Sequence, residues 1–145
     1  MKQKNYQNLT KNTLGKLPVW NLKDLYESPK AKNLNNDLNQ LRIITKKFEK
    51  KYTSKITKLS PSQLLKAIIE LENIDIKIDK IMSYAHLLVA EDGNNEKNKI
   101  FYQQMQEQIT NIASSIVFFS LELNEVSNAK LNKIYADKKL EPYKN

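Results

Sequence analysis

The sequence contains no cysteine, only two glycines and a single histidine, and these scarcities exclude several classes of protein. Without cysteine there is no disulfide framework and no thiolate metal site. One histidine, His86, does not supply the two or three imidazoles of a typical catalytic zinc site. Two glycines cannot build the Gly-rich phosphate loop of dinucleotide-binding or P-loop proteins, and neither motif occurs. The composition argues against a self-contained metalloenzyme or nucleotide-dependent enzyme, and the low glycine content favours helices.

Arginine is also scarce, whereas lysine is abundant, and the 145 residues carry a formal net charge of +8. The excess lies in the first half: residues 1–66 hold 15 bases and 4 acids, while residues 67–145 hold 9 bases and 12 acids. A basic half can attract an anionic partner. However, Arg42 is the only arginine, and aromatic residues do not alternate with the lysines as base stacking would require. We therefore do not expect nucleic acid as a partner, and a solvated lysine face or one that meets an acidic domain is the simpler interpretation.

Residues 1–16 are polar and rich in lysine and asparagine, which predicts a flexible leader before a single helical domain over residues 17–145. This leader lacks the apolar region of a signal peptide. The longest strongly apolar run, residues 116–119, is far shorter than the roughly 20 residues of a membrane span. We expect a cytoplasmic protein with no membrane span.

Apolar residues recur every three or four positions in three long segments, as in amphipathic helices. The segments cover about 31–53, 61–90 and 95–125, and a short turn joins the last two. Long helices with a short connection pack antiparallel. The sequence therefore predicts an all-α fold in which a long helical hairpin packs with an N-terminal helix and a short C-terminal helix. The expected helix signals are the caps Asn21 and Ser60, either Asn94 or Asn95 as the next cap, and a left-handed Gly93.

The same periodicity predicts the core. Its expected members are Leu34, Leu38, Leu41, Phe48 and Tyr52 from the first segment; Leu64, Ile68, Leu71, Ile74 or Asp75, Ile78, Ile81, Ala85 and Leu88 from the second; Phe101, Met105, Ile109, Ile112, Ile116, Phe119 and Leu123 from the third; Trp20, Leu22, Leu25 and Tyr26 ahead of them; and Leu131, Ile134 and Tyr135 after them.

Side chains capable of acid–base chemistry are present, but their spacing does not assemble a site. His86 lies at the edge of an apolar stripe, where a metal would need carboxylates from other helices. Asp75 and Asp79 lie one turn apart on a helix face, which is more typical of solvated surface than of an acid–base pair. The remaining acids are interpreted in the same way: Glu70 and Glu72 diverge on the helix, and Glu91 and Asp92 sit at a turn.

Two further features are polar residues in or beside the apolar run near residue 120. The serines there, Ser114, Ser115 and Ser120, have no nucleophile elbow around them. Glu122 interrupts the run, and we expect its carboxylate to hydrogen-bond across helices or to face a partner domain. The sequence therefore assigns no catalytic, cofactor-binding or metal-ligating residue.

Several short segments, which we call the landmark segments, occur in an informative order and spacing. They are Trp20-Asn21-Leu22-Lys23-Asp24-Leu25-Tyr26, Phe48 with Tyr52, Leu64-Leu65 with Leu71-Glu72, Tyr84-Ala85-His86-Leu87 with Ala90-Glu91-Asp92, Phe118-Phe119-Ser120-Leu121-Glu122-Leu123, and Leu140-Glu141-Pro142-Tyr143. Together they resemble the N-terminal region of oligoendopeptidase F-like zinc metallopeptidases, over about residues 17–145.

Members of that family are several times longer and hold zinc on a His-Glu-x-x-His helix with a further glutamate, far downstream of this region. This chain has no such motif. The resemblance implies the helical N-terminal lobe alone, which in the family helps to wall a channel that admits short peptides. It implies shape and substrate restriction, and it transfers no catalytic residue.

Our leading hypothesis is a non-catalytic lobe, expected to be a truncated or split-gene fragment, that binds no zinc itself. A related hypothesis is a docking subunit for a separately encoded catalytic domain, in which short peptides matter only in the full-length context. The alternative is a stand-alone basic helical module that contacts an anionic partner such as nucleic acid, a membrane surface or an acidic protein. Faces that would meet a missing domain are expected to promote self-association.

Overall fold

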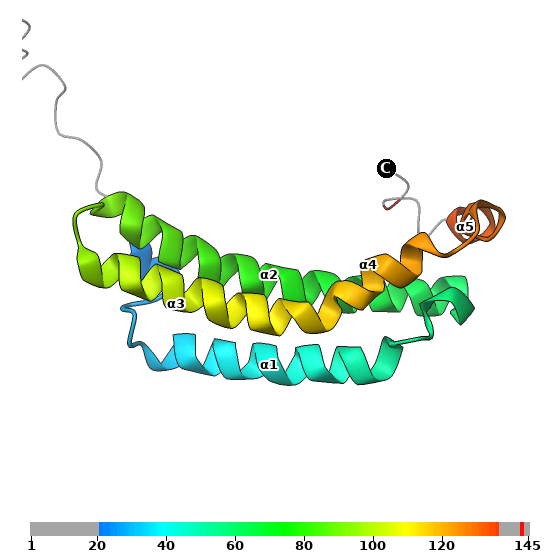
Figure 1. Ribbon diagram of the computed structural model, residues 1–145, viewed down its shortest axis with the longest axis horizontal. Helices are drawn as coiled ribbons and strands as arrows, with labels where there is room; N and C mark the ends of the chain where they lie inside the picture. The colour runs from blue at the N-terminus through cyan, green and yellow to red at the C-terminus, as the bar shows by residue number, and fades with distance from the viewer. Residues whose placement is uncertain (1–20, 137–142, 144–145) are drawn as a thin grey trace, which may run out of the picture.

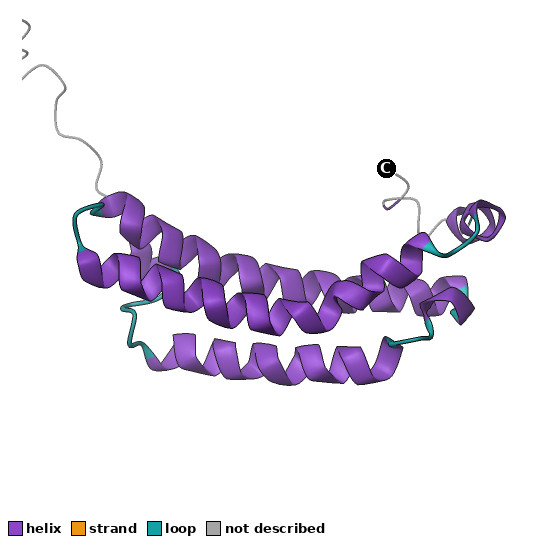
Figure 2. Ribbon diagram, in the orientation of Figure 1, coloured by secondary structure: helices purple, strands orange, loops and turns teal. Residues whose placement is uncertain are grey.

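The computed structural model describes residues 21–136 and Tyr143, so the expected leader and Trp20 lie outside the described residues. All the regular secondary structure of this part is helical (Figure 2), as the sequence predicts. The elements are η1 (Leu22–Asp24), α1 (Lys32–Tyr52), η2 (Ile56–Lys58), α2 (Pro61–Glu91), α3 (Glu96–Ala113), η3 (Ser114–Ile116), α4 (Val117–Asn124) and α5 (Asn128–Tyr135).

The predicted hairpin is the centre of the fold. Helices α2 and α3 run antiparallel along each other, and α1 lies alongside both of them, so that the three helices form an elongated bundle (Figure 1). Helix α4 continues the direction of α3 toward the start of α2, where it packs against η2. The short helix α5 lies at that same end of the bundle.

The core fills the space between these helices, and it is close to the predicted one. All five expected residues of α1 are buried, and the stripes of α2 and α3 are buried or half-buried along their length. Tyr26, which precedes α1, is only 1% exposed and lies edge-on to Tyr84 at 5.2 Å between ring centroids. The rings of Phe48 and Phe119 pack with 5.7 Å between their centroids. These aromatic contacts connect α1 and its preceding turn to the hairpin.

The predicted helix starts are confirmed. Ser60 and Gln63 form a reciprocal capping box at the start of α2, with Pro61 as the first helical residue. Asn95 accepts hydrogen bonds from the backbone N–H groups of the second and third residues of α3. Asn21 caps η1 in the same way, although that turn is a 3₁₀ helix of three residues. Each cap satisfies backbone donors that the helix leaves without partners.

Two local expectations are wrong. The φ of Gly93 lies outside the left-handed range; the α2–α3 turn closes instead through the Asp92 side chain, which accepts from the N–H of Asn94 at 3.1 Å. The left-handed residue is Ser54, with φ of 62°, in the connection after α1.

The continuous helix over 95–125 is also interrupted, by η3. Just before the interruption, the Ser114 hydroxyl donates to the carbonyl of Asn111 at 2.8 Å and so competes with the regular helical ladder. Ile116 and Val117, which are β-branched, follow directly and favour a helix less than unbranched residues do.

Candidate functional site

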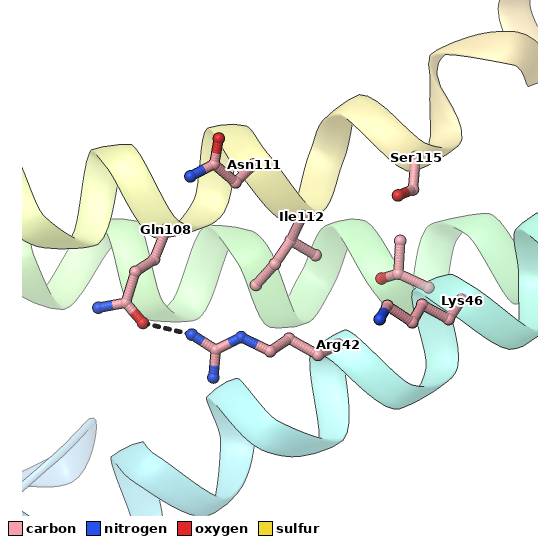
Figure 3. A pocket seen from close by; sticks show the side chains of 7 residues that line it. Arg42, Lys46, Gln108, Asn111, Ile112 and Ser115 are labelled. Carbon is pink, nitrogen blue, oxygen red and sulfur yellow. Dashed lines mark hydrogen bonds between the residues drawn. The ribbon is translucent and has the colours of Figure 1, made fainter.

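One recess on the bundle is a groove between α1 and the α3–η3 segment, with a volume of about 310 Å³. Figure 3 shows it from close by, with α1 on one side and α3 on the other. Thr45 and Ile112 are both buried and form its floor. The other lining residues are polar: Arg42 and Lys46 from α1, and Gln108, Asn111 and Ser115 from the opposite side.

Arg42 is held in a fixed position at one end of this groove. Its Nη1 donates to Oδ1 of Asn39 on the same helix at 3.1 Å, and its Nη2 donates to Oε1 of Gln108 across the groove at 2.5 Å. Both acceptors are neutral amides, so they orient the guanidinium without cancelling its charge. Guanidinium has five N–H donors, and these two bonds leave three for other partners.

The charge on this side of the bundle is positive. Lys46 lies one helical turn after Arg42, and the exposed Lys50 follows one turn later on the same helix. In the described part of the chain, neither Arg42 nor Lys46 lies within ion-pair distance of a carboxylate, and no acid lines the groove. The groove is therefore a donor-rich, cationic recess with an apolar floor.

A second polar cluster lies where the turn before α1 meets the hairpin. The Tyr26 hydroxyl donates to Oδ2 of Asp37 at 2.8 Å, and Nζ of Lys80 lies 3.3 Å from the same oxygen and 4.4 Å from the Tyr26 ring centre. Burial, followed by the bond to Asp37, raises the pKa of Tyr26 well above its ordinary value. Burial by itself would raise the pKa of Asp37, but the bonds from Tyr26 and Lys80 outweigh it and lower that pKa. Because these three groups satisfy one another, the cluster fixes the position of the turn.

Glu122 does hydrogen-bond across helices, which is one of the two alternatives that the sequence leaves open for it. Its carboxylate accepts from the backbone N–H of Ser54 at 2.5 Å and from that of Ile56 at 3.1 Å. Both donors lie in the connection between α1 and α2, next to the left-handed Ser54. The side chain thus fastens this connection to α4.

His86 is exposed, and its ring lies 6.0 Å from that of Tyr102. Asp75 and Asp79 lie on the outer side of α2 with Glu72 nearby, and partial burial of Asp75, followed by repulsion from these two acids, raises its pKa. The structure does not bring His86 and this acidic face into one cluster; among the described residues no three His, Cys, Asp or Glu side chains could hold a metal ion together.

The remaining acids and serines that the sequence offers as candidates lie apart from one another in the fold. Glu70 forms an ion pair with Lys51 at 2.6 Å, and Glu72 accepts from the Tyr143 hydroxyl at 2.9 Å. Of the three serines, only Ser115 faces the groove, and it has no imidazole beside it.

The sequence does not predict the groove, because its walls come from residues about 66 positions apart in the chain. The one available signal is the lone arginine on the polar side of a helix.

None of the helices within the described ranges has the length and apolar character needed to cross a membrane. The sequence was compared with protein-family models, with curated proteins and with solved structures, and no match was found in any of the three.

Proposed function

We propose that this chain is the N-terminal, non-catalytic helical lobe of an oligoendopeptidase F-like zinc metallopeptidase. In this role it helps to wall a channel that admits short peptides, and the zinc and the catalytic groups belong to another domain. The proposal is supported by the landmark residues within the described part of the chain, because several of them contact one another in the fold.

The aromatic landmark residues meet in two places. At one end of the bundle, Tyr26 packs on Tyr84 at 5.2 Å between ring centroids. At the other end, Phe48 packs on Tyr52 at 4.8 Å and on Phe119 at 5.7 Å. These aromatic contacts therefore fix the helices of the lobe relative to one another.

The polar landmark residues are used in the same way. Glu122 accepts from the backbone N–H groups of Ser54 and Ile56, and Glu72 accepts from the Tyr143 hydroxyl. A glutamate within an apolar run costs stability unless it finds such partners. The pairing of Glu122 explains why a Phe-Phe-x-Leu-Glu-Leu pattern suits this fold without any catalytic role for its acid.

The outer faces of α2 and α4 also suit a lobe that packs on another domain. Ile76 is 64% exposed and Leu121 is 61% exposed, and Ile69 and Val117 lie one or two turns from them on the same helices. Helices of a self-sufficient bundle are ordinarily polar on the solvent side. Exposed apolar side chains that follow one helix face are typical of interaction surfaces.

Peptidase assays test this proposal directly. The purified chain should cleave no short fluorogenic peptide, with or without added zinc, and the nucleotide sequence after the Asn145 codon should encode a His-Glu-x-x-His motif. Zinc-dependent turnover that a chelator abolishes, and that co-purifies with the chain, would contradict the proposal.

A second candidate function is favoured by the cationic side of α1, where Arg42, Lys46 and Lys50 are all exposed. In that case the chain is a helical binding module for an anionic partner. Binding to nucleic acid or to acidic vesicles that weakens steeply with salt would support it. An absence of binding at low ionic strength would remove it.

A further inference from the structure

We propose that the groove between α1 and the α3–η3 segment binds a small phosphate monoester that carries an apolar group. The phosphate would lie between Arg42 and Lys46, and the apolar group would lie against Ile112 on the floor. The groove is formed by this chain alone, so binding there does not depend on the proposed lobe function.

The charge of the groove favours an anion with two negative charges. Arg42 and Lys46 together present two positive charges, and in the part of the chain that the structure describes no carboxylate neutralises them. A phosphate monoester carries about −1.5 to −2 charges at neutral pH, whereas a carboxylate or a phosphodiester carries one. The monoester therefore matches the uncompensated charge most closely.

The directions of the donors favour a tetrahedral anion over a planar one. Each Nη atom of Arg42 already donates one hydrogen bond, to Asn39 or to Gln108. A planar carboxylate that binds both Nη atoms at once would compete with these bonds. The donors that remain come from different sides, namely the rest of the guanidinium, the Lys46 ammonium and the Ser115 hydroxyl. In Figure 3, Gln108 and Ser115 both extend from α3 and η3 toward α1. The tetrahedrally arranged oxygens of a phosphate can accept from donors on several sides, whereas the two oxygens of a carboxylate lie in one plane.

The floor favours a ligand with an apolar part. Ile112 is 7% exposed and lines the groove, while the Thr45 hydroxyl is engaged with the carbonyl of Leu41 at 2.7 Å and offers the ligand no donor. Inorganic phosphate would leave this floor in contact with water. A volume of about 310 Å³ also exceeds the needs of a single phosphate and falls within the range of small-molecule sites.

Phenyl phosphate is the probe that combines these features, and calorimetric titration of the whole chain at about 0.15 M salt tests it. We expect saturable binding at one site, which Arg42→Gln and Lys46→Gln each weaken by about tenfold or more, since each removes a charge-assisted bond. Lys50→Gln is the matched control, because it removes the same charge from the same helix outside the groove, and it should change the affinity by less than about twofold. Circular dichroism and thermal melting verify that each variant folds.

Comparison ligands distinguish the alternatives. Benzoate and inorganic phosphate should both bind more weakly than phenyl phosphate, and a single-stranded oligonucleotide should lose as much affinity with Lys50→Gln as with Lys46→Gln. The proposal is overturned if phenyl phosphate shows no saturable binding, if Lys50→Gln weakens it as much as Arg42→Gln does, or if benzoate or inorganic phosphate binds equally well.

Discussion

Glu122→Ala should destabilise the chain more than substitution of any other acid among residues 21–136, because Glu122 is the acid in that range whose side chain accepts from two backbone donors. The substitution removes the acceptor for the N–H groups of Ser54 and Ile56, at 2.5 and 3.1 Å. Hydrogen bonds to a charged group contribute about 1.5–3 kcal/mol each, and the exposed Ser54 can recover part of its loss from water. The expected cost is therefore about 2–4 kcal/mol.

Relaxation of the backbone at Ser54 offsets part of this loss. A non-glycine residue at a φ of 62° is strained by about 1–2 kcal/mol, and the Glu122 carboxylate helps to hold it there. Without that carboxylate the connection between α1 and α2 should relax toward ordinary backbone angles and loosen its contact with α4. For a domain of this size the net effect lowers Tm by up to about 6–12 °C.

Thermal and urea unfolding followed by circular dichroism measure this effect. Glu125→Ala is the control, since it removes the same charge from an exposed position three residues away. It should change the free energy of unfolding by no more than about 0.5 kcal/mol. If Glu122→Ala and Glu125→Ala have equal effects, the carboxylate does not fasten the connection and the account of this residue is wrong.

Three further predictions concern the core and the polar clusters. Ile81→Asp should unfold the chain, because Ile81 is fully buried and an unpaired charge there costs several kcal/mol, while Ile76→Asp on the exposed side of the same helix should retain a cooperative melt. Tyr26→Phe should lower the free energy of unfolding by about 1 kcal/mol, because it removes the hydrogen bond to Asp37. Folding lowers the pKa of Asp37, so the stability that this carboxylate contributes should be present at neutral pH and be lost as the pH falls through the folded pKa. Thermal melts at a series of pH values measure this loss. Asp75→Asn should raise Tm at neutral pH and have a smaller effect in acid, because a pKa raised by folding means that the ionised form opposes folding; equal effects at both pH values would refute this.

The sequence predicts the helices well because the relevant physics is local. Apolar spacing places Leu34, Ile81 and Ile109 in the core, and the Ser60 capping box marks the start of α2 to the residue. The break at η3 is harder to predict, because it depends on a serine hydroxyl that competes with the helical ladder. Helix periodicity continues through Ile116 and conceals it.

The candidate site is not predictable in the same way, because its parts come from different helices. Nothing local to Arg42 indicates that Gln108 will orient it, or that Ile112 will lie beneath it. The sequence leaves the role of Glu122 open between two alternatives, and only the folded chain brings the N–H groups of Ser54 and Ile56 to it. The apolar periodicity of one helix does not indicate which residues of other helices will lie beside it.

The most direct test of the central proposal is reconstitution. The chain should be mixed with the catalytic domain of an oligoendopeptidase F-like enzyme whose own N-terminal lobe has been deleted, and complex formation should be measured by analytical ultracentrifugation. The account predicts a stoichiometric complex that Ile76→Asp weakens, together with restored preference for short peptides over long ones. A chain that sediments independently of the catalytic domain at every concentration, and that leaves its peptide cleavage unchanged, would contradict the account.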